Sequence, residues 1–272
     1  KVSKVGGGVR AESELMAGSF AACRSFTVVA AFCWLAGAAR GDVYRLTSPD
    51  GSAHAELRLD AAGQLFYLAG TRERDVVAQG EIGLTVDGVD LGRLRRLSIL
   101  RLRDETAGYP VRGAHALAKM DATRALYMLE TIGGFNYGLQ AVVCTDGFAW
   151  RFLVPGRGER KVDAERAGWR WPEGSRVWYA SGGQSDGVWT NALAGELPGM
   201  APAWQAELPL VVELPLAGYA AVMEAMPCGA PGEMRLRVGE GGVISGHLAD
   251  EGGFKVSGAV MMPWRAVMMS RT

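Results

Sequence analysis

Alternating apolar and polar positions recur along the chain. Between residues 53 and 60, Ala and Leu occupy the odd positions, and His, Glu, Arg and Asp occupy the even ones. A period of two places one side of an extended segment on a core and the other in water, which predicts a strand. After a turn at Ala62-Gly63, residues 64–68 are predicted to return as the second strand of a hairpin.

Short turns join further segments of the same kind. The Asp87-Gly88 and Asp146-Gly147 pairs each lie between two apolar runs, and Asp-Gly is a favoured two-residue hairpin turn. Later runs at residues 209–214, 219–224 and 234–238 add strands. Because no helical pattern of 10 to 15 residues separates these runs, the sequence predicts an antiparallel sandwich rather than βαβ units.

In two stretches the sequence pattern does not decide the secondary structure. Residues 114–130 fit a helix or a strand about equally well. The polar, Gly-rich connection from residue 181 to residue 205 is long enough for a functional loop or a disordered one.

Composition narrows the class of protein. The chain has 272 residues, 49% of them hydrophobic, and 38 glycines, which excludes wholesale disorder and makes long helices improbable as the main element. Its 29 Lys and Arg balance 29 Asp and Glu, so a sequence-independent grip on nucleic acid is not expected.

The N-terminus has the pattern of an export signal. The first methionine is Met16, so residues 1–15 are interpreted as upstream read-through or the tail of a partial gene model. Arg24, an apolar run at residues 26–35 and the small residues Ala36-Gly37-Ala38 predict a signal peptide over residues 16–39; the alternative is a buried helix. The exported protein would be periplasmic or extracellular, and no apolar run is long enough to span a membrane.

Two cysteines remain after the signal peptide. Cys144 and Cys228 would be exported to an oxidising compartment, where a disulfide between them is permitted. The alternative is that each is a small buried apolar side chain.

A series of short motifs carries a family resemblance. In order along the chain they are Ser48-Pro49-Asp50-Gly51, residues 83–88, residues 146–152, Trp178-Tyr179, residues 209–214, residues 219–225 and Pro263-Trp264-Arg265. In order and spacing, from about residue 42 to the end, they resemble the N-terminal domain of glycoside hydrolase family 97.

The resemblance implies a fold and a role. Residues 42–272 would form one all-β domain, a β-supersandwich of antiparallel sheets like that of galactose mutarotase. In the family this domain packs on a (β/α)8 barrel and completes its active-site rim. It would contact an α-linked oligosaccharide, a glucoside or galactoside. The catalytic carboxylates belong to the barrel, so no catalytic residue is assigned here and the chain alone is expected to be inactive.

Calcium is the cofactor that the resemblance implies. A glutamate of this domain reaches the ion in the family, but the matching stretch, residues 184–189, has none. Asp186 is therefore the candidate ligand, with Glu196 further along as the alternative. One carboxylate never makes a calcium site alone, and the other interpretation of Asp186 is a solvated loop residue.

Two residues are assigned to carbohydrate. Aromatic faces stack on sugar rings, and the tryptophans expected to be exposed are Trp169, Trp171, Trp189 and Trp204. Of these, Trp189 in the long connection is the predicted platform. Glu224, at the end of an apolar run, is predicted to bind sugar; its alternative is a hydrogen-bonded structural role. Glu213 is predicted to be solvated.

Other chemistry is less well supported. Arginines and leucines interleave over residues 93–103, which favours a solvated edge strand over a phosphate-binding face. An aldose-mutarotase-like enzyme, one alternative function, needs a histidine and a glutamate facing one sugar, but His54, His115 and His247 are far apart in the sequence. A structural or adhesive exported sandwich is the other alternative.

Overall fold

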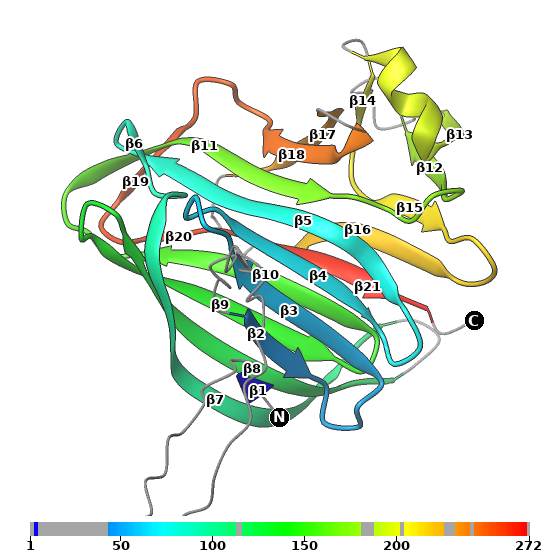
Figure 1. The fold of residues 1–272 in the computed structure, drawn as a ribbon, viewed down its shortest axis with the longest axis horizontal. Helices are drawn as coiled ribbons and strands as arrows, with labels where there is room; N and C mark the ends of the chain where they lie inside the picture. The colour runs from blue at the N-terminus through cyan, green and yellow to red at the C-terminus, as the bar shows by residue number, and fades with distance from the viewer. Residues whose placement is uncertain are drawn as a thin grey trace, which may run out of the picture.

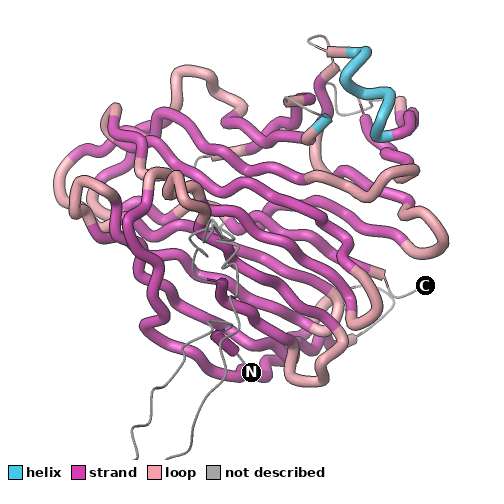
Figure 2. Tube along the Cα trace, viewed as in Figure 1, coloured by secondary structure: helices cyan, strands magenta, loops and turns pink. Residues whose placement is uncertain are grey.

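The computed structural model describes residues 3–4, 43–112, 116–180, 188–201, 204–225, 232–239 and 242–270. Nearly all of these residues lie in strands or the turns that join them (Figures 1 and 2). The predicted signal peptide lies outside the described residues, as do His115, Asp186 and Cys228. No helix among the described residues is long and apolar enough to cross a membrane.

The described strands form two antiparallel sheets. An eleven-stranded sheet contains, in spatial order, β1 (Ser3–Lys4), β2 (Val43–Thr47), β3 (Ala53–Leu59), β4 (Leu65–Thr71), β5 (Asp75–Val86), β11 (Glu159–Trp169), β18 (Ile244–Leu248), β17 (Met234–Val238) and β14 (Gln205–Ala206), with β6 (Val89–Asp90) beside β5 and β19 (Phe254–Ser257) beside β11. Strand β1 belongs to the segment that the sequence suggested was upstream read-through, and it pairs with β2.

The second sheet has ten strands. Its spatial order is β13 (Trp189–Leu193), β12 (Arg176–Ala180), β15 (Leu210–Glu213), β16 (Tyr219–Ala225), β21 (Trp264–Met269), β10 (Gly147–Val154), β9 (Asn136–Cys144), β8 (Leu117–Thr131) and β7 (Leu94–Pro110), with β20 (Val260–Met261) beside β10. The expected all-β sandwich of antiparallel sheets is confirmed.

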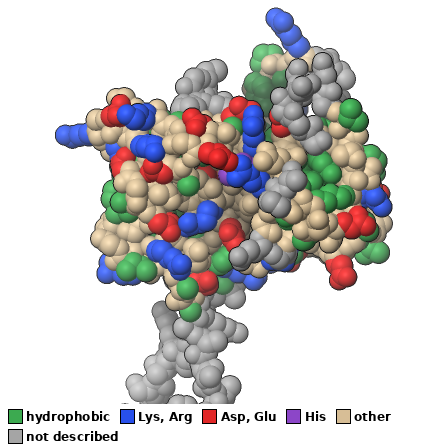
Figure 3. All heavy atoms as spheres, turned by 90° about the horizontal axis from the view of Figure 1, so that it is seen from above, with side chains coloured by type: hydrophobic (Ala, Val, Ile, Leu, Met, Phe, Trp, Pro, Cys, Tyr) green, Lys and Arg blue, Asp and Glu red, His purple; other side chains and the backbone are tan. Residues whose placement is uncertain are grey.

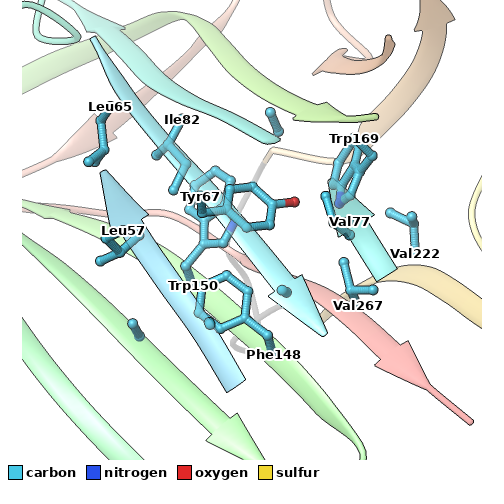
Figure 4. Close-up of a cluster of buried hydrophobic side chains, with 14 of the residues drawn as sticks. Leu57, Leu65, Tyr67, Val77, Ile82, Phe148, Trp150, Trp169, Val222 and Val267 are labelled. Atoms are coloured by element: carbon cyan, nitrogen blue, oxygen red, sulfur yellow. The ribbon is translucent and has the colours of Figure 1, made fainter. Parts of the chain in front are cut away.

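The core lies between the two sheets and follows the predicted alternation. Leu57 and Leu65 from one sheet face Phe148, Trp150 and Val267 from the other, together with Tyr67 and Trp169 (Figure 4). The ring centroids of Tyr67 and Phe148 are 5.3 Å apart across the interior. A Cβ on Gly80 would lie 2.0 Å from the Tyr67 ring, so only glycine leaves room for this ring.

Turn chemistry explains two glycines differently. Asp87 and Gly88 both have positive φ, 53° and 73°, as the predicted Asp-Gly hairpin requires. The other predicted turn is one residue off, because Gly147 already pairs with Cys144 at the start of β10. Gly147 is instead needed because the neighbouring strand comes close: a Cβ there would lie 2.7 Å from the Val267 carbonyl oxygen.

The structure decides between the alternatives for the two stretches whose sequence pattern was ambiguous. Residues 117–131 form strand β8, so the helix alternative for residues 114–130 is wrong. Part of the connection after residue 181 forms β13 and the 3-10 helix η1 (Ala194–Met200). Cys144 is a free cysteine, and burial, the main cause, raises the pKa of its thiol to about 11.

Three tryptophans expected to be exposed are buried. Trp169, Trp171 and Trp204 are 1%, 7% and 5% exposed and belong to the core. Trp169 ends an inward-facing run of β11, and Trp204 packs edge-on against Tyr179 with ring centroids 5.1 Å apart. A turn-rich sequence around them does not say which side of a sheet a large ring takes. Trp189 alone of the four is exposed.

Candidate functional site: the outer face of the ten-stranded sheet

The outer faces of the two sheets differ in character. The eleven-stranded sheet presents ion pairs to solvent, including Arg45 with Glu56 and Arg166 with Asp90. Acidic and basic side chains are interspersed on the face shown in Figure 3, without gathering by sign. Such a surface is typical of a solvated face and does not indicate a binding partner.

The ten-stranded sheet instead presents an apolar outer face at its centre. On β16, β21 and β10, the inward positions belong to the core, so the residues between them point outward. We call these outward residues the apolar face: Ala149, Ala221, Met223, Ala266 and Met268. All are partly or well exposed, and Met268 is 44% exposed. A contiguous apolar surface is the kind of feature at which another molecule or domain can pack.

Two arginines adjoin the apolar face. The guanidinium carbons of Arg151 and Arg124 lie 4.4 Å and 5.5 Å from the centre of the Trp264 ring, within cation–π range. Arg151 also donates from Nε to Gln140 Oε1 at 2.7 Å. Burial, more than the neighbouring Arg124, lowers the pKa of Arg151.

At the other end of the sheet, aromatic and polar side chains share the same outer face. We call this set the aromatic strip: Arg176, Trp178, Trp189, Asn191, Glu213 and Tyr219. The strands β13, β12, β15 and β16 are consecutive in the sheet. Their registers pair Trp178 with Asn191, Ala180 with Trp189, Arg176 with Glu213, and Glu213 with Tyr219. Cross-strand partners point to the same side, so the six side chains lie together.

The aromatic strip is exposed, and its polar members are bonded to one another. Trp178 is 37% exposed, and Trp189 and Tyr219 are each 50% exposed. Arg176 Nη1 donates to Asn191 Oδ1 at 2.7 Å, and Trp178 Nε1 donates to Glu213 Oε2 at 3.4 Å. The predicted solvated position of Glu213 is therefore confirmed, with Trp178 as its partner.

A buried ionic cluster connects the two sheets on the inner side. Arg265 of β21 is fully buried, and its Nε lies 3.0 and 3.1 Å from the two carboxylate oxygens of Glu165 on β11. Its other nitrogens donate to Glu224 Oε2 at 2.5 Å and to the Gly232 carbonyl at 3.1 Å. Burial alone would lower the pKa of Arg265, but the two glutamates raise it above its usual value, so the arginine stays charged.

Glu224 has a structural partner and also borders a cavity. The cavity has a volume of about 540 Å³, and Asp250, Phe254 and Leu248 line it as well. Burial raises the pKa of Glu224, while the charge of Arg265 acts in the opposite direction. The ion pair with Arg265 matches the structural alternative that the sequence left open for this residue.

The two predicted carbohydrate residues do not form one site. Trp189 points outward from β13, whereas Glu224 is cross-strand to Arg265 and points inward.

For calcium, the alternative ligand Glu196 is exposed on η1, and its carboxylate accepts the Leu193 N–H at 3.0 Å. Within the described residues, no three His, Cys, Asp or Glu side chains form a group that could hold a metal ion.

Of the two histidines that the structure describes, neither His54 nor His247 is bonded to Glu224. His54 is buried, with Nε2 3.0 Å from Asp75 Oδ1. His247 and Glu165 both border a cavity of about 390 Å³, but both carboxylate oxygens of Glu165 are bonded to Arg265. Glu81 is the other carboxylate that borders this cavity.

The pairing of Arg265 with Glu165 in the buried ionic cluster was not predicted from the sequence. Arg265 stands at an inward position of an alternating run with Val267 and Met269, and a charge on the apolar side of a strand was the available signal. Glu165 gave no such signal, because the register shifts between Val162 and Ala164 and breaks the alternation.

Solved structures share the fold at low sequence identity. A β-arabinopyranosidase superposes with a TM-score of 0.73 and 14% identity over 83% of this chain and 40% of its own. A glycoside hydrolase family 97 enzyme from Pseudoalteromonas sp. strain K8, in complex with acarbose, has a TM-score of 0.69 and 13% identity over 84% of this chain and 36% of its own. A variant of that enzyme in complex with panose has a TM-score of 0.68.

The sequence itself matches one family. Among curated proteins, no sequence matches the chain. The family described as "Glycosyl-hydrolase 97 N-terminal" matches residues 46–272, which is most of the chain and nearly all of the sandwich. The chain spans 36 to 40% of the length of the solved enzymes above. With its sandwich fold and this match, the chain belongs to the N-terminal domain family of glycoside hydrolase 97.

Proposed function

We propose that the chain is the non-catalytic N-terminal domain of an exported α-glycoside hydrolase. The family match over residues 46–272 is the observation that carries this proposal. In the proposal, the apolar face packs on the catalytic (β/α)8 barrel of the same polypeptide, and the domain completes the rim of the active site. The apolar face supports this arrangement because its five outward residues are alanines and methionines, which carry no charge.

The proposed ligand is an α-linked oligosaccharide. Acarbose and panose are bound to the solved family 97 enzyme and its variant, while the β-arabinopyranosidase acts on a different sugar according to its name. Trp189 and Glu224 are the proposed carbohydrate contacts on this domain. Trp189 is accessible for stacking, whereas Glu224 would have to share its carboxylate with Arg265.

The first test combines gene structure with an assay. The reading frame downstream of Thr272 should continue into a (β/α)8 domain. The chain expressed by itself should not hydrolyse 4-nitrophenyl α-glucoside or α-galactoside, because glycoside hydrolysis needs two carboxyl groups across one sugar and family catalysis resides in the barrel. Turnover by the pure chain, lost on Glu224→Gln, would instead make it an enzyme in its own right.

Calcium remains a prediction for the complete enzyme, with Asp186 as the proposed ligand from this domain. A missing charged ligand lowers affinity for a hard cation, so binding weaker than is typical of the family is expected. Calorimetric titration of calcium into the complete enzyme and its Asp186→Ala variant measures this. Unchanged affinity in the variant would exclude Asp186 and direct attention to Glu196.

A further inference from the structure

We propose that the aromatic strip is an oligosaccharide-binding subsite on the domain surface. Its stacking residues are Trp178 and Trp189, supported by Tyr219. The choice of an α-linked ligand rests on the proposed function; the location of the subsite rests on the strip itself.

Stacking is the first requirement of such a subsite, and the strip meets it. Trp189 is the diagonal neighbour of Trp178, since Trp178 pairs directly with Asn191 two residues further along. Diagonal neighbours across paired strands are roughly 7–8 Å apart, a spacing comparable with one to two sugar rings. Both indoles are exposed, so their faces are available to the C–H groups of a pyranose.

Hydrogen bonding to sugar hydroxyls is the second requirement. Asn191 on β13 and Glu213 on β15 lie on the two sides of the strand that carries Trp178, and Arg176 precedes Trp178 by two residues on that strand. The bonds from Arg176 to Asn191 and from Trp178 to Glu213 hold these side chains in place, which reduces the ordering cost of binding. Each group retains donors or acceptors beyond this one bond, because a guanidinium has five N–H donors and a carboxylate about four acceptor positions.

The mixture of groups favours sugar over a protein surface. Aromatic rings with adjoining amide, carboxylate and guanidinium groups match a ligand that has both C–H faces and hydroxyls. The apolar face differs, since its five residues are alanines and methionines without polar partners. Burying the strip under an apolar protein surface would strand Glu213 and Arg176 without solvent, whereas a sugar supplies hydroxyls to both.

Titration of maltotetraose into the chain tests the subsite, with isothermal calorimetry as the measurement. We expect Trp178→Ala and Trp189→Ala each to weaken binding about tenfold, as loss of a central stacking contact does. Tyr109→Ala is the matched control, because Tyr109 is 56% exposed on β7 at the opposite end of the same sheet. Thermal unfolding of each variant verifies that the exposed substitutions leave the fold intact.

The outcomes separate this inference from the proposed function. No binding of maltotetraose, or equal affinity in both tryptophan variants and the parent, overturns the subsite. Equal binding of the β-linked cellotetraose overturns the choice of an α-linked ligand. If the strip variants loosen domain packing in the complete enzyme and leave maltotetraose binding unchanged, the strip is a protein interface and the subsite is wrong. The reading-frame and hydrolysis tests address the proposed function and do not depend on these results.

Discussion

Arg265 and Glu165 place two opposite charges in the interior between the sheets, at 0% and 1% side-chain exposure. Removing ions from water costs several kcal/mol each, and only close contact with satisfied hydrogen bonds compensates. The pair has these bonds: Glu165 receives donors on both oxygens, and Glu224 and Gly232 accept from Nη1 and Nη2 of Arg265. The cluster therefore joins β21 to β11 in one specific arrangement.

Removal of Arg265 should strongly destabilise the fold. In Arg265→Met, Glu165 keeps a buried carboxylate without a counter-charge, and the expected loss in unfolding free energy is about 3–5 kcal/mol. The double variant Arg265→Met with Glu165→Met should recover much of this loss, because apolar groups of similar size replace the pair. Urea denaturation followed by fluorescence measures both.

Arg166→Met is the control for this prediction. Arg166 lies beside Glu165 on β11, but it is partly exposed and pairs with Asp90 at 2.9 Å on the outer face. An exposed pair contributes about 1 kcal/mol or less. If Arg265→Met costs no more than Arg166→Met, the buried cluster does not contribute as argued.

Residue-level prediction from the sequence succeeded where one strand decided the outcome. Alternation predicted Glu213 on the outer side of its strand, and the structure confirms it. Trp169, Trp171 and Trp204 were misplaced because their burial depends on how two sheets stack, which a single segment does not encode. Trp178 and Tyr219 join Trp189 only through pairing of four strands, and the sequence does not specify that pairing.

At the scale of elements, β7 is a long strand at the end of the ten-stranded sheet. Four arginines are exposed on this strand, Arg95, Arg96, Arg101 and Arg103. The prediction of a solvated edge strand is therefore confirmed. Leu100 and Leu102 on the same strand are 57% and 40% exposed. An exposed strand edge with apolar residues is a template for pairing with another chain, and charges such as Arg101 and Arg103 oppose that pairing.

Replacing both arginines should therefore promote self-association. In Arg101→Val with Arg103→Val, the edge becomes apolar and β-branched, and light scattering of a concentrated solution on warming should rise several-fold.

The double variant Arg112→Val with Arg157→Val removes the same charge from exposed positions outside strands. It should scatter like the parent chain. Equal scattering by the two double variants would show that net charge, not the strand edge, controls association.

Strands were predicted correctly where the turn residues were typical and the alternation of apolar and polar positions was unbroken. The strands of the first hairpin follow their alternation, and Asp87-Gly88 forms the expected turn. Strand β11 was not among the predicted strands, and a register shift at Val162–Ala164 disturbs its alternation. Strand β13 lies within a Gly-rich connection whose composition indicates a loop, yet it pairs with β12 along its whole length. Long-range pairing overrides local composition there.

On the scale of the whole molecule, both sheets carry ion pairs, such as Arg45 with Glu56 on one and Arg124 with Glu105 on the other, but the ten-stranded sheet has an apolar centre on its outer side. The core of a sandwich needs only the inner faces of its sheets to be apolar, so Ala149, Ala266 and Met268 are not required to be apolar for folding. A second covered face is expected where another domain packs, as the proposed function requires. The family resemblance indicated the neighbouring domain, but only the strand registers show which outward residues form the apolar face.

A charge at the centre of the apolar face should separate the two domains of the complete enzyme. Ala266→Asp would bury a carboxylate against the catalytic domain without a partner, and burial of an unpaired charge is disfavoured strongly enough to open an interface. Thermal unfolding by calorimetry should then change from one cooperative transition to two, and limited proteolysis should cleave between the domains. Ala78→Asp makes the same substitution at an exposed position of the eleven-stranded sheet and should leave one transition. The chain by itself should tolerate both changes equally, since residue 266 faces solvent there. A complete enzyme that keeps a single transition with Ala266→Asp would place the catalytic domain on another surface of the sandwich.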